Sequence, residues 1–170
     1  MKLFMPQGPL HPCPLPKVAG QPNRGACFSA DGDILAFAVS EKGQNKTDLN
    51  GDTDKNDDVV EMYRLSTGTR VSTNRSVWTH SAIVTKGTLG AFRIYEANER
   101  VSLNGDADHL DKVIAMMDTA TLTSTVLGYA AETHFAIEAG HVIWRTSEAA
   151  QGNTDLNGDG DAFDTVLMYQ

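Results

Sequence analysis

The chain has 170 residues, of which 14 are Lys or Arg and 22 are Asp or Glu, so its formal net charge is −8. This length is enough for one domain and too short for two well-packed ones. The acidic balance argues against nucleic acid as a partner, because phosphate contacts need a basic patch. No apolar run approaches the roughly 20 residues that cross a bilayer, so we expect no membrane insertion.

The first segment, residues 1–24, is rich in proline. All six prolines lie within the first 22 residues, and their fixed φ and missing N–H disfavour helix and central strands. We expect this segment to be extended or irregular. It has no apolar stretch typical of a secretory signal, so export would depend on a leader outside this sequence. Cys13 and Cys27 can form one disulfide or remain two thiols.

Three repeats of about 53 residues follow this segment. The tripeptide Asn-Gly-Asp recurs at Asn50, Asn104 and Asn157, at intervals of 54 and 53 residues. A bulky aromatic, then a glutamate four residues later, precedes each copy; the glutamates are Glu41, Glu96 and Glu148. The repeats are assigned to residues 25–78, 79–131 and 132–170, and the third lacks its last strand.

Each repeat is predicted to form four antiparallel strands. In the second copy, the alternation of apolar and polar residues predicts strands over 82–85, 89–95, 112–117 and 124–129. Four-stranded units at this period are typical of β-propeller blades. The predicted class is therefore all-β and propeller-like. A fragment of a longer propeller and an irregular sandwich remain alternatives.

Three blades are fewer than the four to eight that usually close a ring. We therefore expect a homodimer of six blades. We expect a strand near residues 15–21 to supply the missing fourth strand of the third blade in the partner. The N-terminal segment of one chain would then complete the C-terminal blade of the other.

The acidic residues are concentrated between the second and third strands of the repeats, where 12 of the 15 aspartates fall in three segments. Oxygen-bearing side chains at alternate positions converge when a loop wraps around an ion, and hard oxygen donors without His or Cys favour Ca²⁺, with Mg²⁺ second. Solvated turns are the alternative, but turns need only one or two such residues. The predicted ligands are Asp48, Asn50, Asp52, Asp54 and Asp57; Asn104, Asp106, Asp108 and Asp111; and Asp155, Asn157, Asp159, Asp161 and Asp164. Ser102 replaces the first aspartate of the second loop, so we expect weaker occupancy there.

These loops resemble the calcium loops of FG-GAP repeats in integrin-type β-propellers, which carry a similar D-x-N-G-D-G-x-x-D stretch between two strands. They are also similar to thrombospondin type 3 calcium loops. One extra residue before the last aspartate departs from the FG-GAP pattern. The resemblance implies a calcium-stiffened propeller blade used for adhesion or scaffolding.

The predicted function is a non-catalytic calcium-binding scaffold with a protein or glycan ligand. The three glutamates are expected either to ligate the ion or to bond the loop backbone, with exposed strand ends as the alternative. A propeller enzyme, such as a glycosidase or lyase, is the alternative function. Its candidate acids outside the loops are Glu61, Glu99, Glu132 and Glu138, with no signal for pairing. Millimolar calcium outside cells favours an extracellular or periplasmic location.

Overall fold

The computed structural model of the chain describes residues 28–78 and 81–170. The expected strand over residues 15–21 and both cysteines lie outside the described residues. Within the described part, every strand belongs to one of three antiparallel sheets, each built from strands that are consecutive in the chain. The predicted all-β class is therefore confirmed.

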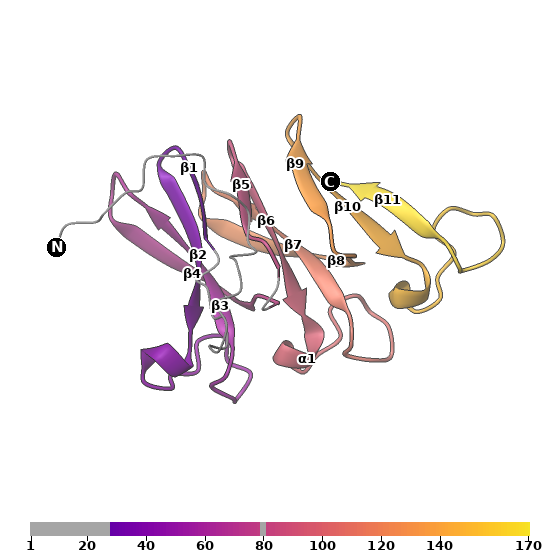
Figure 1. Cartoon of the computed structure of the whole chain (residues 1–170), viewed down its shortest axis with the longest axis horizontal. Helices are drawn as coiled ribbons and strands as arrows, with labels where there is room; N and C mark the ends of the chain where they lie inside the picture. Colours follow the sequence, from indigo (N-terminus) through magenta and orange to yellow (C-terminus); the bar gives the residue numbers. More distant parts are fainter. Residues whose placement is uncertain (1–27, 79–80) are drawn as a thin grey trace, which may run out of the picture.

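The three sheets follow the three repeats in order (Figure 1). The first sheet contains β1 (Phe28–Asp31), β2 (Ile34–Ser40), β3 (Asp58–Arg64) and β4 (Thr69–Ser76). The second contains β5 (Val84–Lys86), β6 (Leu89–Tyr95), β7 (Lys112–Asp118) and β8 (Thr123–Ala130). The third contains β9 (Phe135–Glu138), β10 (His141–Ser147) and β11 (Thr165–Tyr169).

The predicted strands of the second repeat agree closely with these bounds. β6 begins and ends at the predicted residues, whereas β5 begins at Val84, two residues later than predicted. The reason is that Ile83 leaves the sheet edge and packs into the apolar core between the first two sheets, with 3% of its surface exposed.

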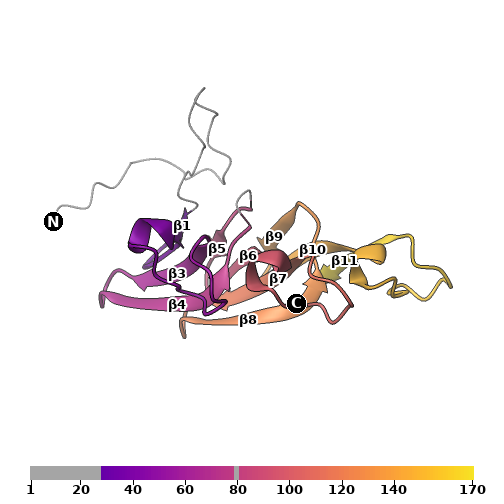
Figure 2. The ribbon, with the colours of Figure 1, turned by 90° about the horizontal axis from the view of Figure 1, so that it is seen from below.

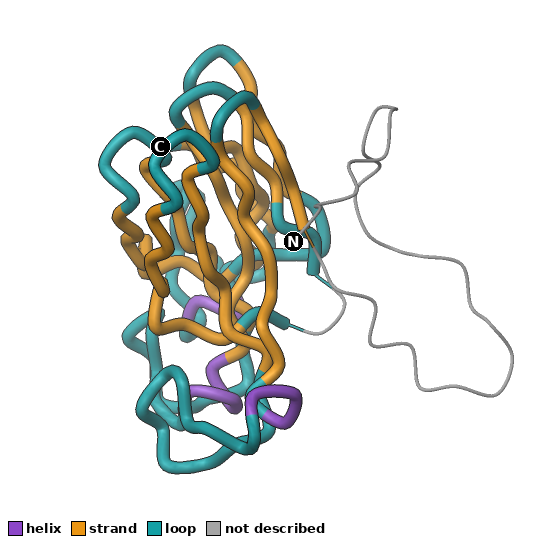
Figure 3. Tube along the Cα trace, turned by 90° about the vertical axis from the view of Figure 1, so that its left-hand side faces the viewer, coloured by secondary structure: helices purple, strands orange, loops and turns teal. Residues whose placement is uncertain are grey.

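Short helical turns occupy equivalent places directly after the second strand of each sheet. They are η1 (Lys42–Gln44), α1 (Glu96–Glu99) and η2 (Ala149–Gln151). None exceeds four residues, in keeping with the all-β prediction. Figure 3 shows these turns and the long acidic loops gathered toward one end of the strands.

Consecutive sheets pack face to face through two apolar cores (Figure 2). Because side chains alternate between the two faces of a strand, each sheet can contribute one face to each neighbour. The first core joins Ile34, Ala36, Val60 and Met62 of the first sheet to Phe92, Ile94, Ala115 and Met117 of the second. The second core joins Ala91 and Ile114 of the second sheet to Ile137, Val142 and Trp144 of the third.

The fourth strands repeat one irregularity that confirms the internal symmetry. Val59 on β3 pairs with Ser76 on β4. The residue two positions after Val59 pairs with the residue four positions before Ser76, so the register shifts at this point. Val113 and Ala130 begin the same shift between β7 and β8. Among the described residues the third sheet contains three strands, with β11 at one edge.

No helix among the described residues is long and apolar enough to cross a membrane. The three described sheets form an open array, so the closed propeller and the six-bladed dimer remain predictions.

Candidate metal centres

A fully buried glutamate holds the first acidic loop in place. Glu41 follows β2 directly and has 0% of its surface exposed. Its Oε1 accepts the N–H of Leu49 at 2.6 Å, and its Oε2 accepts the N–H of Asp57 at 3.0 Å. One carboxylate therefore fixes both the beginning and the end of the loop.

The same arrangement recurs in the other two repeats. Oε2 of Glu96 accepts the N–H of Asp111 at 3.2 Å, and Oε2 of Glu148 accepts that of Asp164 at 3.0 Å. Both glutamates are fully buried, and their Oε1 atoms accept backbone N–H groups at the start of their loops. The expected backbone bonds are thus present, and the alternative of exposed strand ends is wrong.

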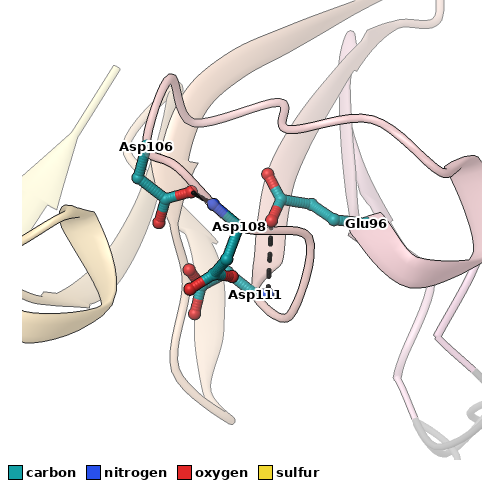
Figure 4. Close-up of side chains that lie close together, drawn as sticks. All are labelled: Glu96, Asp106, Asp108 and Asp111. Carbon is teal, nitrogen blue, oxygen red and sulfur yellow. Dashed lines mark hydrogen bonds between the residues drawn. The ribbon is translucent and has the colours of Figure 1, made fainter.

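Each glutamate also belongs to a cluster of carboxylates whose nearest oxygens all lie within 4.8 Å of one another. The clusters are Glu41, Asp54 and Asp57; Glu96, Asp106, Asp108 and Asp111; and Glu148, Asp161 and Asp164. Figure 4 shows the four side chains of the second cluster converging from the end of β6 and from the loop. Seven of the predicted ligands are therefore brought together, and the glutamates join them.

The first predicted ligand of the loop has a different place. Both carboxylate oxygens of Asp48 accept backbone N–H groups of the following turn, from Gly51 at 2.6 Å and Thr53 at 3.1 Å. Asp155 caps its loop in the same way, and neither residue is part of the carboxylate clusters. These aspartates shape the loop around the cluster.

Ser102 takes over this capping position in the second loop. Its hydroxyl oxygen accepts the N–H of Gly105 at 3.1 Å. The replacement therefore changes the cap of the turn and leaves the cluster intact. The second cluster has four carboxylates and the others three. The expected weaker calcium occupancy of the second loop stays a prediction. The replacement by Ser102 does not remove a carboxylate from the cluster.

The asparagines link the two sides of each loop. The side-chain amide of Asn157 donates to Oδ2 of Asp164 at 3.0 Å, and its oxygen accepts the N–H of Asp159 at 3.0 Å. Asn50 and Asn104 make the corresponding bonds. Asp52 and Asp159 likewise lie outside the three clusters, and each accepts the backbone N–H two residues later.

The carboxylates of the first cluster repel one another. Burial, followed by repulsion from Asp54, Asp52 and Glu41, raises the pKa of Asp57 to about 7. In addition, Oδ2 of Asp52 is buried without a hydrogen-bond partner. A divalent cation would neutralise the repelling carboxylates of the cluster, so the donor set fits a hard cation.

The other clusters show the same tendency. Burial is the main cause that raises the pKa of Asp111 to about 6, and Asp106 adds to it. A hydrogen bond with Asp159 is the main cause that raises the pKa of Asp164. All members of the three clusters are oxygen donors, without His or Cys. That composition favours Ca²⁺ or Mg²⁺ over zinc or copper.

Each of the first two loops also contacts the following repeat, which the sequence did not predict. Nη2 of Arg100, just after α1, donates to Oδ2 of Asp54 at 3.0 Å. The side-chain amide of Asn104 donates to the carbonyl oxygen of Ala150 in η2 at 2.9 Å. The first two acidic loops therefore lie at the joints between consecutive sheets.

The candidate acids of the enzyme alternative all form ion pairs with basic side chains. The pairs are Glu61 with Arg70, Glu99 with Arg75, Glu132 with Arg145, and Glu138 with Lys86.

Searches of protein-family models and of curated proteins find no match to this chain.

Proposed function

We propose that this chain is a non-catalytic calcium-binding repeat protein, in which Ca²⁺ stiffens the acidic loops of a propeller-like scaffold for adhesion or binding. The observation that carries this proposal is the threefold repetition of a buried glutamate with two or three aspartates within 4.8 Å. A chance acidic turn does not recur at the same place in three consecutive sheets.

Calcium is preferred over magnesium because of the number and flexibility of the oxygen donors. Ca²⁺ accepts six to eight oxygens in variable geometry, whereas Mg²⁺ demands an octahedron and keeps several waters. The carboxylates come from the buried glutamate and from the aspartates of the loop. The side chain of Asp48, which caps the turn, orders it before any ion enters.

In this proposal the bound ions stabilise the folded loops and take no part in a reaction. Each loop connects the second and third strands of a sheet, and the first two loops contact the next repeat, so a cation bound in either of these two orders both a sheet and a joint. A ligand that binds only the folded state stabilises it by RT ln(1 + [L]/Kd). Weak sites of this kind are filled by the millimolar calcium outside cells, so an extracellular or periplasmic location belongs to the proposal.

The test is thermal unfolding of the calcium-loaded protein, with and without excess EDTA, followed by return of calcium or magnesium to the stripped protein. We expect a large fall in Tm on chelation, restored by calcium more fully than by magnesium. An unchanged Tm in EDTA would show that the loops are solvated turns and would refute the proposal.

A further inference from the structure

One packing rule is repeated along the array. We call the face that a sheet turns toward the next repeat its leading face, and the opposite face its trailing face. Val60 on the leading face of the first sheet is fully buried by the second sheet, and Ile114 on the leading face of the second is fully buried by the third. Each follows the last aspartate of its acidic loop by three residues.

The leading face of the third sheet carries the same apolar positions without a described sheet over them. Leu167 follows Asp164 by three residues and is therefore the counterpart of Val60 and Ile114, yet 69% of its surface is exposed. Tyr169, two residues along β11 on the same face, is 72% exposed. Its counterpart in the first sheet is Met62, which is fully buried.

The trailing face of the first sheet is the matching surface at the other end of the array. Phe37, Phe92 and Trp144 occupy the same register, four residues before the buried glutamate of their repeats. Phe92 and Trp144 are 0% and 2% exposed because each packs against the preceding sheet. Phe37 is only partly buried and no described sheet precedes it, whereas Val39 and Val59 on the same face are buried.

The residue three positions after the buried glutamate of each repeat gives a second comparison between the trailing faces. Gln151 reaches back to the preceding sheet, where its Oε1 accepts the N–H of Ala130 in β8 at 2.8 Å. Glu99 does the same with the N–H of Ser76 in β4 at 2.6 Å. Gln44 is their counterpart in the first repeat, three residues after Glu41, and it is exposed.

We infer that these two faces bind each other between copies of this chain, so that the Leu167 face of one copy packs on the Phe37 face of the next. The occupant is a second copy because the trailing face of the first sheet has the counterparts of the features that already cover Val60 and Ile114 within the chain: an aromatic in register and a helical turn whose last residue, in the second and third repeats, bonds to the preceding sheet. Two copies joined twice in this head-to-tail manner form a closed set of six sheets.

This inference rests on the propeller-like part of the proposed function and assigns its partner. The test is the mass of the full chain in calcium, measured by sedimentation equilibrium over a range of concentrations. We expect two copies per particle. A particle that stays monomeric at the highest concentration, or one that grows beyond two copies, overturns the proposal.

Two variants locate the contact, and one serves as a control. Leu167→Asp places a charge on the leading face and is expected to yield monomers, with an unchanged circular dichroism spectrum because the residue is exposed within one copy. Phe37→Ala on the trailing face is expected to raise the dimer dissociation constant roughly 30-fold, as for an interface hot spot. Val101→Asp changes an exposed apolar residue outside both faces and should leave the dimer intact.

The pattern of results separates this inference from its alternatives. A dimer that survives Leu167→Asp overturns the assigned surface. A dimer that is broken by Leu167→Asp but is indifferent to Phe37→Ala shows two Leu167 faces packed symmetrically, which overturns the head-to-tail arrangement. A monomer whose Tm still depends on calcium overturns this inference alone, whereas a dimer indifferent to calcium overturns only the calcium proposal.

Discussion

Glu41 and Asp57 join the two ends of the first acidic loop through reciprocal hydrogen bonds. The N–H of Glu41 donates to the carbonyl oxygen of Asp57 at 2.9 Å, and the N–H of Asp57 donates to Oε2 of Glu41 at 3.0 Å. The protein therefore closes the loop with its own backbone. In the proposed function a cation neutralises the clustered charges, and these two roles can be separated by experiment.

Removal of one clustered charge should have opposite effects with and without calcium. Asp161→Asn keeps the shape of the side chain but removes a ligand, so we expect a lower Tm in calcium. In chelator the same change relieves repulsion on Asp164, so the Tm should stay equal or rise. Glu138→Gln, which removes an exposed carboxylate paired with Lys86 far from the loops in sequence, is the matched control. Equal losses of Tm in both buffers would contradict a ligand role for Asp161.

Loss of a buried glutamate should be costly whether or not calcium is present. Glu148→Gln replaces one accepting oxygen by an NH₂ group that faces backbone N–H donors. A buried donor left without an acceptor costs about 1–3 kcal/mol. We expect a decrease of this size in the free energy of unfolding from urea denaturation, in calcium and in chelator alike. A loss confined to the calcium buffer would show that Glu148 acts only as a ligand.

The stability of the calcium-free protein should depend on pH in an unusual direction. Burial and the neighbouring carboxylates raise the pKa of Asp57 from its ordinary value of 3.8 to about 7. The folded state therefore binds more protons than the unfolded state between these values, and stability falls as the pH rises through 7. We expect the urea midpoint of the stripped protein to be lower at about pH 8 than at about pH 5, if this group dominates.

Asp57→Asn should flatten that pH dependence, because the titrating group is removed. Glu138→Gln, an exposed change outside the loops, should leave the slope as it is. A calcium-free protein whose stability rises steadily between about pH 5 and about pH 8 would contradict the raised pKa as its main determinant.

Arg100 should compete with calcium for Asp54 in the first loop. The guanidinium donates to Oδ2 of Asp54 at 3.0 Å, across the joint between two sheets. Arg100→Gln removes a largely exposed ion pair worth about 0.2–1 kcal/mol. We therefore expect calcium affinity at one site to rise roughly two- to fivefold in calorimetry. Arg145→Gln, which breaks the comparable pair with Glu132, is the control and should leave affinity unchanged. A fall in affinity with Arg100→Gln would show that the arginine orders the loop for the ion.

Much of the fold could be predicted because its signals are local. Period-2 patterning and the Gly-containing turns located strands such as β6, and the recurrence of Asn-Gly-Asp located the three acidic loops. The roles of individual loop residues could not be read in the same way. Asp48 and Asp54 are both aspartates in one short motif, yet Asp48 caps a turn while Asp54 joins the carboxylate cluster. Their difference depends on which backbone N–H groups the folded loop places beside each side chain.

The amino-acid sequence by itself determined the all-β class, the three repeats and the acidic composition of the loops, because strand alternation and turn chemistry act over a few residues. The tertiary structure alone decided that Glu41 is buried as the acceptor of loop N–H groups, and that Arg100 of one repeat contacts Asp54 of another. It also decided that Ile114 is buried while its repeat counterpart Leu167 is exposed. Equivalent residues on equivalent strands differ in this way because burial is set by the sheet that packs over them, and that sheet comes from a distant part of the chain.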